Sequence, residues 1–359
     1  MPKKKQTSNE ALHEALLMVA PGTLLREGLS AILQAGTGAL LCFGDAARLA
    51  KLSEGGFKMD APVTPQLLYE LSKMDGAIIL DREATRIYYA NRFLKPAAKI
   101  PSDETGTRHR IAQRLAAQAK CMVIAVSQRR ASVTLYVHDK RHVLDSVPAL
   151  VNKAVQAIQT LEKYMSVLNQ AMQDLTTREF QDVVTIFDVC RAIQRTEMVI
   201  RISKEIQPYL MELGTEGRLI ELQLKELILP VNEAVLAIKD YYRERTGITY
   251  ESVREKISQI PPQELLQLGS ISHALGFGPN IRSIDSYLSP RGYRVLTATH
   301  RISPQIIQNL VQQFGNLQNI LHAPTEELVK VEGVGEVLAE RIRVSLNLLR
   351  NQLALDDRR

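Results

Sequence analysis

The chain has 359 residues, of which 45% are hydrophobic and 23% charged, as in ordinary globular proteins. Its length predicts two or three domains, and a net charge of +6 makes a polyanionic partner plausible. No apolar run approaches the roughly 20 residues of a membrane-spanning helix, so we expect no membrane partner. The three cysteines, Cys42, Cys121 and Cys190, are far apart and indicate neither a disulfide framework nor a zinc site.

The N-terminus carries Lys3, Lys4 and Lys5 without the apolar segment of a secretory signal. We therefore expect a solvated tail and a cytoplasmic location.

Residues 1–145 alternate helical patterns with short apolar strands. Thr64-Pro65 begins a helix that ends near Met74, because threonine is a good N-cap and proline suits the first helical position. We interpret these residues as one α/β domain with a mixed central sheet. Further helices are predicted at 9–20 and 23–35, and strands at 38–44, 78–80, 87–94, 122–126, 131–137 and 141–144.

From residue 146 onward the pattern is helical. Apolar residues recur three or four positions apart from Leu150 to Met172, and helical stretches follow at 182–213 and 217–243. We predict an all-α helical spine over 146–285. A small all-α domain is predicted over 286–359, with a helix that begins at Ser303-Pro304.

The run Thr105-Gly106-Thr107-Arg108-His109-Arg110 concentrates hydroxyl, imidazole and guanidinium groups in six residues. Apolar residues at helical spacing follow it, so the run lies at a helix N-terminus, where free backbone amides favour phosphate. Arginine adds planar forks that match phosphate oxygens. The sequence therefore predicts a phosphate site here, although a solvated basic turn is the alternative.

Asp75-Gly76-Ala77 leads directly into the apolar strand at 78–80. This order places a carboxylate at a sheet edge, beside backbone that a ligand can approach closely.

The stretch Val331-Glu332-Gly333-Val334-Gly335 has apolar helical patterns on both sides and resembles the helix-hairpin-helix motif. In that motif the hairpin amides contact a DNA phosphate without reading sequence. Residues 285–359 have nine Lys/Arg and eight Asp/Glu, a net charge of +1. DNA binding would therefore need a local patch or several copies; a simple packed αα-hairpin is the alternative. The DNA-binding residues predicted on this basis are Lys330, Gly333, Val334, Gly335, Arg341 and Arg343.

The pair Asp75-Gly76-Ala77 and Arg108-His109-Arg110 closely resembles the signature of the diadenylate cyclase family. The order of catalytic domain, helical spine and terminal helix-hairpin-helix is similar to the DNA-integrity-scanning branch of that family, over essentially all 359 residues. Two departures stand out: Ile111 occupies a position where a small hydroxyl residue often follows the motif, and Gln128 interrupts a basic run.

The resemblance implies condensation of two ATP molecules into cyclic di-AMP, with Mg²⁺ or Mn²⁺ as cofactor. It implies that Asp75 is the catalytic residue and holds the metal. It also implies a homo-oligomer, an octamer by the family resemblance, with facing catalytic domains, and branched DNA such as junctions as a partner. The nucleotide-binding residues would be Gly76, Ala77, Leu94, Thr107, Arg108, His109, Arg110, Ile111, Ser127 and Arg130.

Two other functions are considered. A non-catalytic, ATP-sensing DNA-binding scaffold would not require the acid at position 75. A helix-hairpin-helix nuclease or ligase is not favoured, because we find no adenylated-lysine motif and no cluster of acids suited to two metals.

Overall fold

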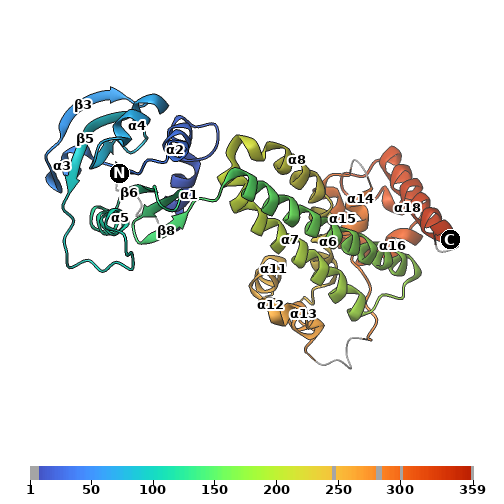
Figure 1. Ribbon diagram of the computed structural model, residues 1–359. Coiled ribbons are helices and arrows are strands. Elements are labelled where there is room, and N and C mark those ends of the chain that lie inside the picture. The colour runs from blue at the N-terminus through green and yellow to red at the C-terminus, as the bar shows by residue number, and fades with distance from the viewer. Residues whose placement is uncertain (1–7, 245–247, 280–284, 300–301, 357–359) are drawn as a thin grey trace. The chain divides into compact units, whose positions relative to one another are not determined.

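The computed structural model describes residues 8–244, 248–279, 285–299 and 302–356 (Figure 1). Residue contacts divide the chain into two compact units. Unit 1 comprises Met1–Gln156 and Ile206–Glu221, and unit 2 comprises Ala157–Glu205 and Leu222–Arg359. The predicted lysine tail lies outside the described residues. The domain boundaries predicted after residues 145 and 285 stay predictions.

Unit 1 is built on a mixed sheet with strand order β2-β5-β4-β1-β6-β7-β8, and β3 pairs with β5. β1 and β4 are parallel and the other pairs are antiparallel, which confirms the predicted α/β class. The strands are β1 (Ala39–Phe43), β2 (Ser53–Glu54), β3 (Phe57–Pro62), β4 (Ala77–Leu80), β5 (Arg86–Leu94), β6 (Met122–Ser127), β7 (Ser132–Val137) and β8 (Lys140–Val143).

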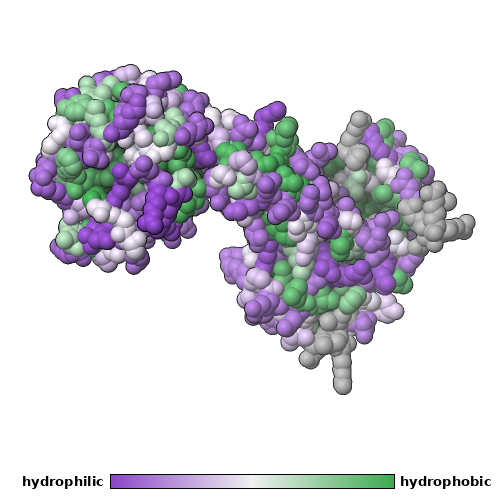
Figure 2. All heavy atoms as spheres, in the orientation of Figure 1, coloured by the Kyte–Doolittle hydropathy of each residue, from purple (hydrophilic) through white to green (hydrophobic). Residues whose placement is uncertain are grey.

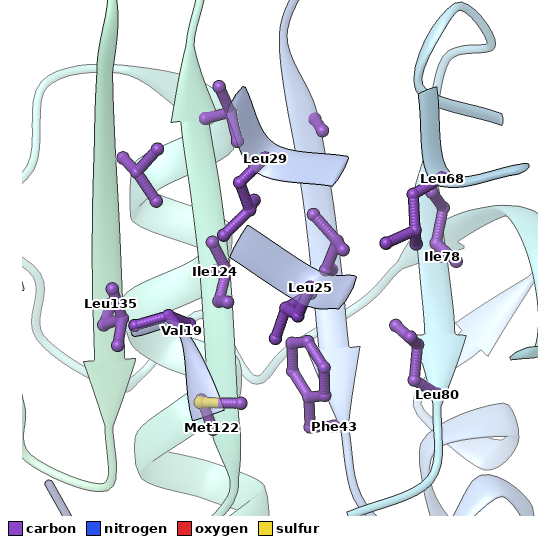
Figure 3. Packing of buried hydrophobic residues seen from close by; sticks show 14 of the residues in the cluster. Val19, Leu25, Leu29, Phe43, Leu68, Ile78, Leu80, Met122, Ile124 and Leu135 are labelled. Atoms are coloured by element: carbon purple, nitrogen blue, oxygen red, sulfur yellow. The ribbon is translucent and has the colours of Figure 1, made fainter. Parts of the chain in front are cut away.

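Helices cover both faces of this sheet. On one face, Leu25 and Leu29 pack with Phe43, Ile78 and other alternate strand residues (Figure 3). The other face packs against Leu49 and the apolar side of the helix that begins at Thr107. The helices of this unit before residue 145 are α1 (Ser8–Met18), α2 (Leu24–Gln34), α3 (Ala46–Lys51), α4 (Pro65–Ser72) and α5 (Thr107–Ala119).

Between the strand at 38–44 and the helix that begins at Thr64-Pro65, the sequence predicts no helix or strand. The structure places α3, β2 and β3 there. Asp45 caps α3 through the backbone N–H groups of Ala47 and Arg48, while no residue of β3 is buried. An exposed edge strand lacks the apolar alternation by which strands are predicted.

In the described residues after β8, the regular secondary structure is helical apart from one isolated β-bridge between Thr185 and Tyr287, which confirms the predicted all-α middle and tail. Three of them have residues in both units: α6 (Val147–Gln181), α7 (Ile186–Leu213) and α8 (Arg218–Leu227). The other helices are η1 (Gly214–Gly217), α9 (Val231–Ala234), α10 (Leu236–Tyr241), α11 (Tyr250–Gln259), α12 (Pro262–Leu265), α13 (Leu268–Leu275), α14 (Tyr293–Ala298), α15 (Pro304–Phe314), α16 (Leu317–His322), α17 (Thr325–Leu328) and α18 (Glu336–Asp356).

The stretch predicted to be helical over 217–243 is helical in the structure, but it is not one continuous helix. The chain instead forms α8, α9 and α10 in succession, and Pro230 stands between α8 and α9. Proline has no backbone N–H and its ring clashes with the preceding turn, which explains the break.

The described part of the chain contains no helix long and apolar enough to cross a bilayer. Apolar side chains are nevertheless exposed on and after α8, where Leu219, Leu222 and Leu229 are 69%, 52% and 66% exposed. Figure 2 shows hydrophobic residues gathered at the surface over α8.

Candidate functional site

The predicted site residues of unit 1 gather at one edge of the sheet. β1 and β4 are parallel and begin at Ala39 and Ala77, so Asp75 and Gly76 lie at the edge where both strands begin. The antiparallel neighbours β5 and β6 end at this same edge, at Leu94 and Ser127. Strand register therefore brings together residues that are far apart in the chain, such as Asp75 and Ser127.

Arg108 reaches this edge from the first turn of α5. Its Nη1 donates a hydrogen bond of 3.4 Å to the carbonyl oxygen of Val126, near the end of β6. A Cβ atom at Gly38, just before β1, would overlap the guanidinium group. Glycine at this position is thus what lets Arg108 lie against the start of β1, a contact that the sequence did not reveal.

His109 is buried at the N-terminus of α5, with 8% of its surface exposed. Its ring meets that of Tyr136 edge to face at a centroid distance of 6.3 Å. Within the residues that the structure describes, its Nε2 atom is buried and has no hydrogen-bond partner. Burial lowers the pKa of His109, and the nearby positive charges of Arg130 and Arg108 act in the same direction. A neutral imidazole with a buried, unpaired nitrogen at a helix N-terminus is suited to pair with a bound ligand, because buried polar atoms are normally paired.

Thr107 and Arg110 are exposed in the same first turn. The Arg110 side chain donates to the carbonyl oxygens of Glu104 (3.3 Å) and Thr105 (3.1 Å), so it holds the residues before the helix. Ile111 is partly buried and packs against the hydrophobic core beneath the sheet. It therefore occupies the inner side of α5, where an aliphatic side chain is well accommodated.

Gly76 has φ +97°, and a Cβ there would lie 2.9–3.0 Å from backbone atoms of Asn91 and Arg92 in β5. Glycine is thus required by the neighbouring strand as well as by any ligand. Ala77 is fully buried and Leu94 is 8% exposed, and both belong to the core under α5. Their side chains therefore pack in the core beneath the site.

Ser127 ends β6 and its hydroxyl accepts a hydrogen bond of 3.3 Å from the backbone N–H of Arg130. The Arg130 side chain is exposed in the β6–β7 turn and contributes to the positive field at His109. The turn therefore presents a second arginine close to the α5 N-terminus.

Asp75 is exposed in the turn between α4 and β4. Across the described ranges, no group of three or more His, Cys, Asp or Glu side chains could hold a metal ion by itself. A single exposed carboxylate fits Mg²⁺ or Mn²⁺ only when substrate phosphates and water supply the other ligands, which is a common arrangement for magnesium.

The predicted DNA-binding hairpin lies in unit 2, between α17 and α18. Gly333 has φ +85°, and a Cβ there would lie 3.2 Å from Ile306 Cγ1, whereas a Cβ at Gly335 would meet nothing within 4 Å. Val334 is buried and packs in the core of this part of unit 2. Lys330, Arg341 and Arg343 are exposed around the hairpin, and Arg343 forms an ion pair of 2.9 Å with Glu340.

Besides Gly38, sequence reasoning missed three residues of the site, Glu104, Tyr136 and Arg141. Glu104 accepts hydrogen bonds at one carboxylate oxygen from the Tyr136 hydroxyl (2.6 Å) and from Arg141 Nε (2.7 Å). The sequence signal was weak, because Glu104 looks like one more acid in a polar loop. The sequence could have indicated the pairing of Tyr136 with Arg141, because these residues face each other across the tight β7–β8 hairpin.

Comparisons with known proteins agree with this architecture. Family models match three segments: "DisA bacterial checkpoint controller nucleotide-binding" at residues 26–141, "DisA bacterial checkpoint controller linker region" at 144–284, and "Helix-hairpin-helix motif" at 302–352.

Among curated proteins, the chain is 48% identical to the DNA integrity scanning protein DisA of Carboxydothermus hydrogenoformans, over 96% of this chain and 98% of that protein. It is 45% identical to the protein of the same name from Acetivibrio thermocellus, over 98% of each chain. A crystal structure of DacA from Staphylococcus aureus covers 37% of this chain and 88% of its own, at 23% identity and a TM-score of 0.29, a likeness too low to bear on the fold. The near full-length identity to the curated relatives shows that this chain belongs to the family of DNA integrity scanning proteins called DisA.

Proposed function

We propose that the chain is a diadenylate cyclase that condenses two ATP molecules into cyclic di-AMP and two pyrophosphates. The observation that supports this most is the unpaired, buried Nε2 of His109 at the N-terminus of α5, beside Arg108 and at the sheet edge that carries Asp75. Family membership, including a match to a nucleotide-binding model over this domain, supports the same reaction class.

In the proposed reaction, the 3′-oxygen of each ATP forms a bond to the α-phosphorus of the other. The bond between the α-phosphorus and the bridging oxygen breaks, pyrophosphate leaves, and the hydroxyl proton is released. Such a transfer needs positioning and charge neutralisation more than covalent help from the protein. Arg108 and Arg130 would neutralise the phosphates, and the α5 amides would bind them.

Asp75 would hold Mg²⁺ or Mn²⁺ together with the substrate phosphates, and the metal would supply further charge neutralisation when bound. Thr107 would add a hydroxyl to the phosphate contacts. The neutral imidazole of His109 would pair with a phosphate oxygen through Nε2 if that nitrogen carries the proton.

A product with two equivalent linkages needs two sets of these groups, and unit 1 supplies one. The second set would come from a symmetric copy, with the two sheet edges facing each other. We therefore include a homo-oligomer in the proposal, an octamer by the family resemblance. The exposed leucines on and after α8 support self-association, because exposed apolar patches mark contact surfaces.

The hairpin at Gly333 to Gly335 would bind phosphates of branched DNA, such as junctions. The local patch of Lys330, Arg341 and Arg343 and the unobstructed Gly335 support this part. ATP and chromosomal DNA are both found in the cytoplasm, where we propose that the protein acts.

The proposal is tested by incubating the purified protein with ATP and MnCl₂ and identifying the nucleotide product by mass spectrometry. We expect cyclic di-AMP from the wild type and none from Asp75→Asn. ATP binding without any dinucleotide product would overturn the cyclase proposal and favour an ATP-sensing scaffold.

A further inference from the structure

The connection between β5 and α5 follows the outer side of α5 before it enters the helix. Polar side chains of α5 hold it in place. Gln118 Oε1 accepts from the N–H of Ala97 (2.8 Å), and Arg114 Nε donates to the carbonyl oxygen of Ile100 (2.8 Å). Ser102 and Gln113 form a further hydrogen bond. These bonds fix the connection from Ala97 to Ser102. Among the described side chains of α5, only Arg110 is hydrogen-bonded to the residues just before the helix, Glu104 and Thr105.

Those last residues are held at Glu104 by the β7–β8 hairpin. Tyr136 and Arg141 are directly paired across the two strands, so their side chains project from the same face. Both donate to Glu104 Oε1, at 2.6 and 2.7 Å. The Glu104 side chain is only 10% exposed. We call Glu104, Tyr136 and Arg141 the carboxylate triad.

The carboxylate triad contacts the first turn of α5, Thr107 to Arg110, at two points, and we call this segment the phosphate-binding turn. The Glu104 carbonyl oxygen accepts from Arg110, so the position of Glu104 also sets that of the Arg110 guanidinium. The Tyr136 ring forms the edge-to-face wall against which His109 packs. Displacement of Glu104 would therefore move His109 and Arg110 of the Arg108-His109-Arg110 motif.

The negative charge of Glu104 gives a second reason why Arg141 is needed beside it. Burial opposes ionisation of Glu104, but the hydrogen bond from Tyr136 and the charge of Arg141 outweigh it and lower the pKa of the carboxyl. Glu104 is thus a carboxylate beside a site for highly charged phosphates. Without Arg141, its negative charge would oppose phosphate binding and would compete for the motif's own cations.

We infer that the carboxylate triad is a positioning unit: Glu104 holds the phosphate-binding turn in place, and Arg141 with Tyr136 neutralises and orients Glu104. This inference rests on the proposed function. No member of the triad is assigned a contact with the reacting atoms, so each acts through Arg110 and His109.

A double-mutant cycle tests the inference, with KM and kcat for ATP measured on the intact oligomer. Arg141→Met should raise KM by about tenfold and change kcat less, because the uncompensated Glu104 charge weakens phosphate binding. Glu104→Gln/Arg141→Met should bring KM back to within about threefold of Glu104→Gln alone, because the repelling charge is gone. Tyr136→Phe should raise KM by about threefold.

The matched control is Lys140→Met, which removes the same charge one position away, on the opposite face of β8. It should leave KM unchanged. Equal effects of Lys140→Met and Arg141→Met, or no recovery in the double variant, would overturn the positioning role while the wild type still makes cyclic di-AMP. A wild type that makes none would instead overturn the proposed function, and the inference with it.

Discussion

Charged side chains are used in opposite ways in the two units. At the sheet edge of unit 1, Asp75 is exposed, and the described residues provide no hydrogen bond or ion pair to its carboxylate. In unit 2, Glu179 and Asp240 are buried with Arg294, with exposures of 0%, 1% and 3%.

The buried cluster of unit 2 satisfies its own carboxylates. Glu179 accepts from the Tyr241 hydroxyl (2.7 Å) and from Arg294. Asp240 accepts from the backbone N–H groups at the start of α14, those of Gly292 (2.8 Å), Tyr293 (2.6 Å) and Arg294 (2.9 Å). The comparison teaches that buried carboxylates which serve the fold are bonded within it, whereas the exposed Asp75 carboxylate is free to bind solvent or a ligand.

The largest effect should come from the open carboxylate. Asp75→Asn should lower kcat/KM for cyclic di-AMP synthesis by about 10³-fold or more, since it removes the only carboxylate of the two motifs. The free energy of unfolding should change by less than about 0.5 kcal/mol, because Asp75 is exposed. Product assays and chemical denaturation check both values. Near-wild-type synthesis would remove Asp75 from the site.

Breaking the buried cluster should have the reverse effect: a large loss of stability instead of a large loss of synthesis. Arg294→Met should destabilise unit 2 by about 3–5 kcal/mol, because it leaves Glu179 and Asp240 buried without their cation. Arg343→Met, which removes an arginine from an exposed ion pair, is the control and should cost less than about 1 kcal/mol. Equal losses in denaturation of the two variants would show that the buried cluster has no special role in stability.

The buried Glu179 carboxyl should give the free energy of unfolding a pH dependence of intermediate size. Burial raises the pKa of its carboxyl to about 6, against an ordinary value of 4.5. The folded state therefore binds this proton more tightly than the unfolded state, and the stability it contributes is lost as pH rises through about 6. Relative to Glu179→Gln, the wild type should lose about 2 kcal/mol of unfolding free energy between pH 4.5 and 7. A wild type that gains stability over this range would contradict the assignment.

The smallest effect concerns the hairpin of unit 2. Leucine at Gly333 would strain a left-handed backbone and press on Ile306, so its effect mixes folding with binding. Gly335→Leu is the sharper test, because a Cβ there meets open space. It should weaken junction-DNA binding about tenfold by blocking phosphate approach, and the wild-type affinity should fall as salt rises. Unchanged affinity in Gly335→Leu, with unfolding unchanged, would remove the hairpin from the DNA interface.

Sequence reasoning predicted the parts of the molecule that follow local rules. The Thr64-Pro65 helix start and the buried strands of the sheet are where capping and apolar patterns place them. It failed in two places. The apolar pattern over 217–243 continues past Pro230, where the helix breaks, and the edge strand β3 has no buried side to reveal it.

The candidate site divides in the same way. Arg108 and His109 could be predicted because helix-start chemistry is local. Glu104 and Gly38 could not, because the role of Glu104 depends on β7 and β8 and that of Gly38 on Arg108 of α5, all of which are distant in the chain. The carboxylate triad exists only once the hairpin is folded against the turn.

The most direct test of the central claim compares ATP with 3′-deoxy-ATP, which lacks the attacking hydroxyl. Pyrophosphate release and protein melting temperature are measured with each nucleotide and MnCl₂. The account predicts one pyrophosphate per ATP consumed, with cyclic di-AMP as product. It predicts no pyrophosphate from 3′-deoxy-ATP, but a raised melting temperature, because binding stabilises the folded state. Release of pyrophosphate from 3′-deoxy-ATP, or no stabilisation by either nucleotide, would contradict the claim that two nucleotides react through their 3′-hydroxyls at the sheet edge of unit 1.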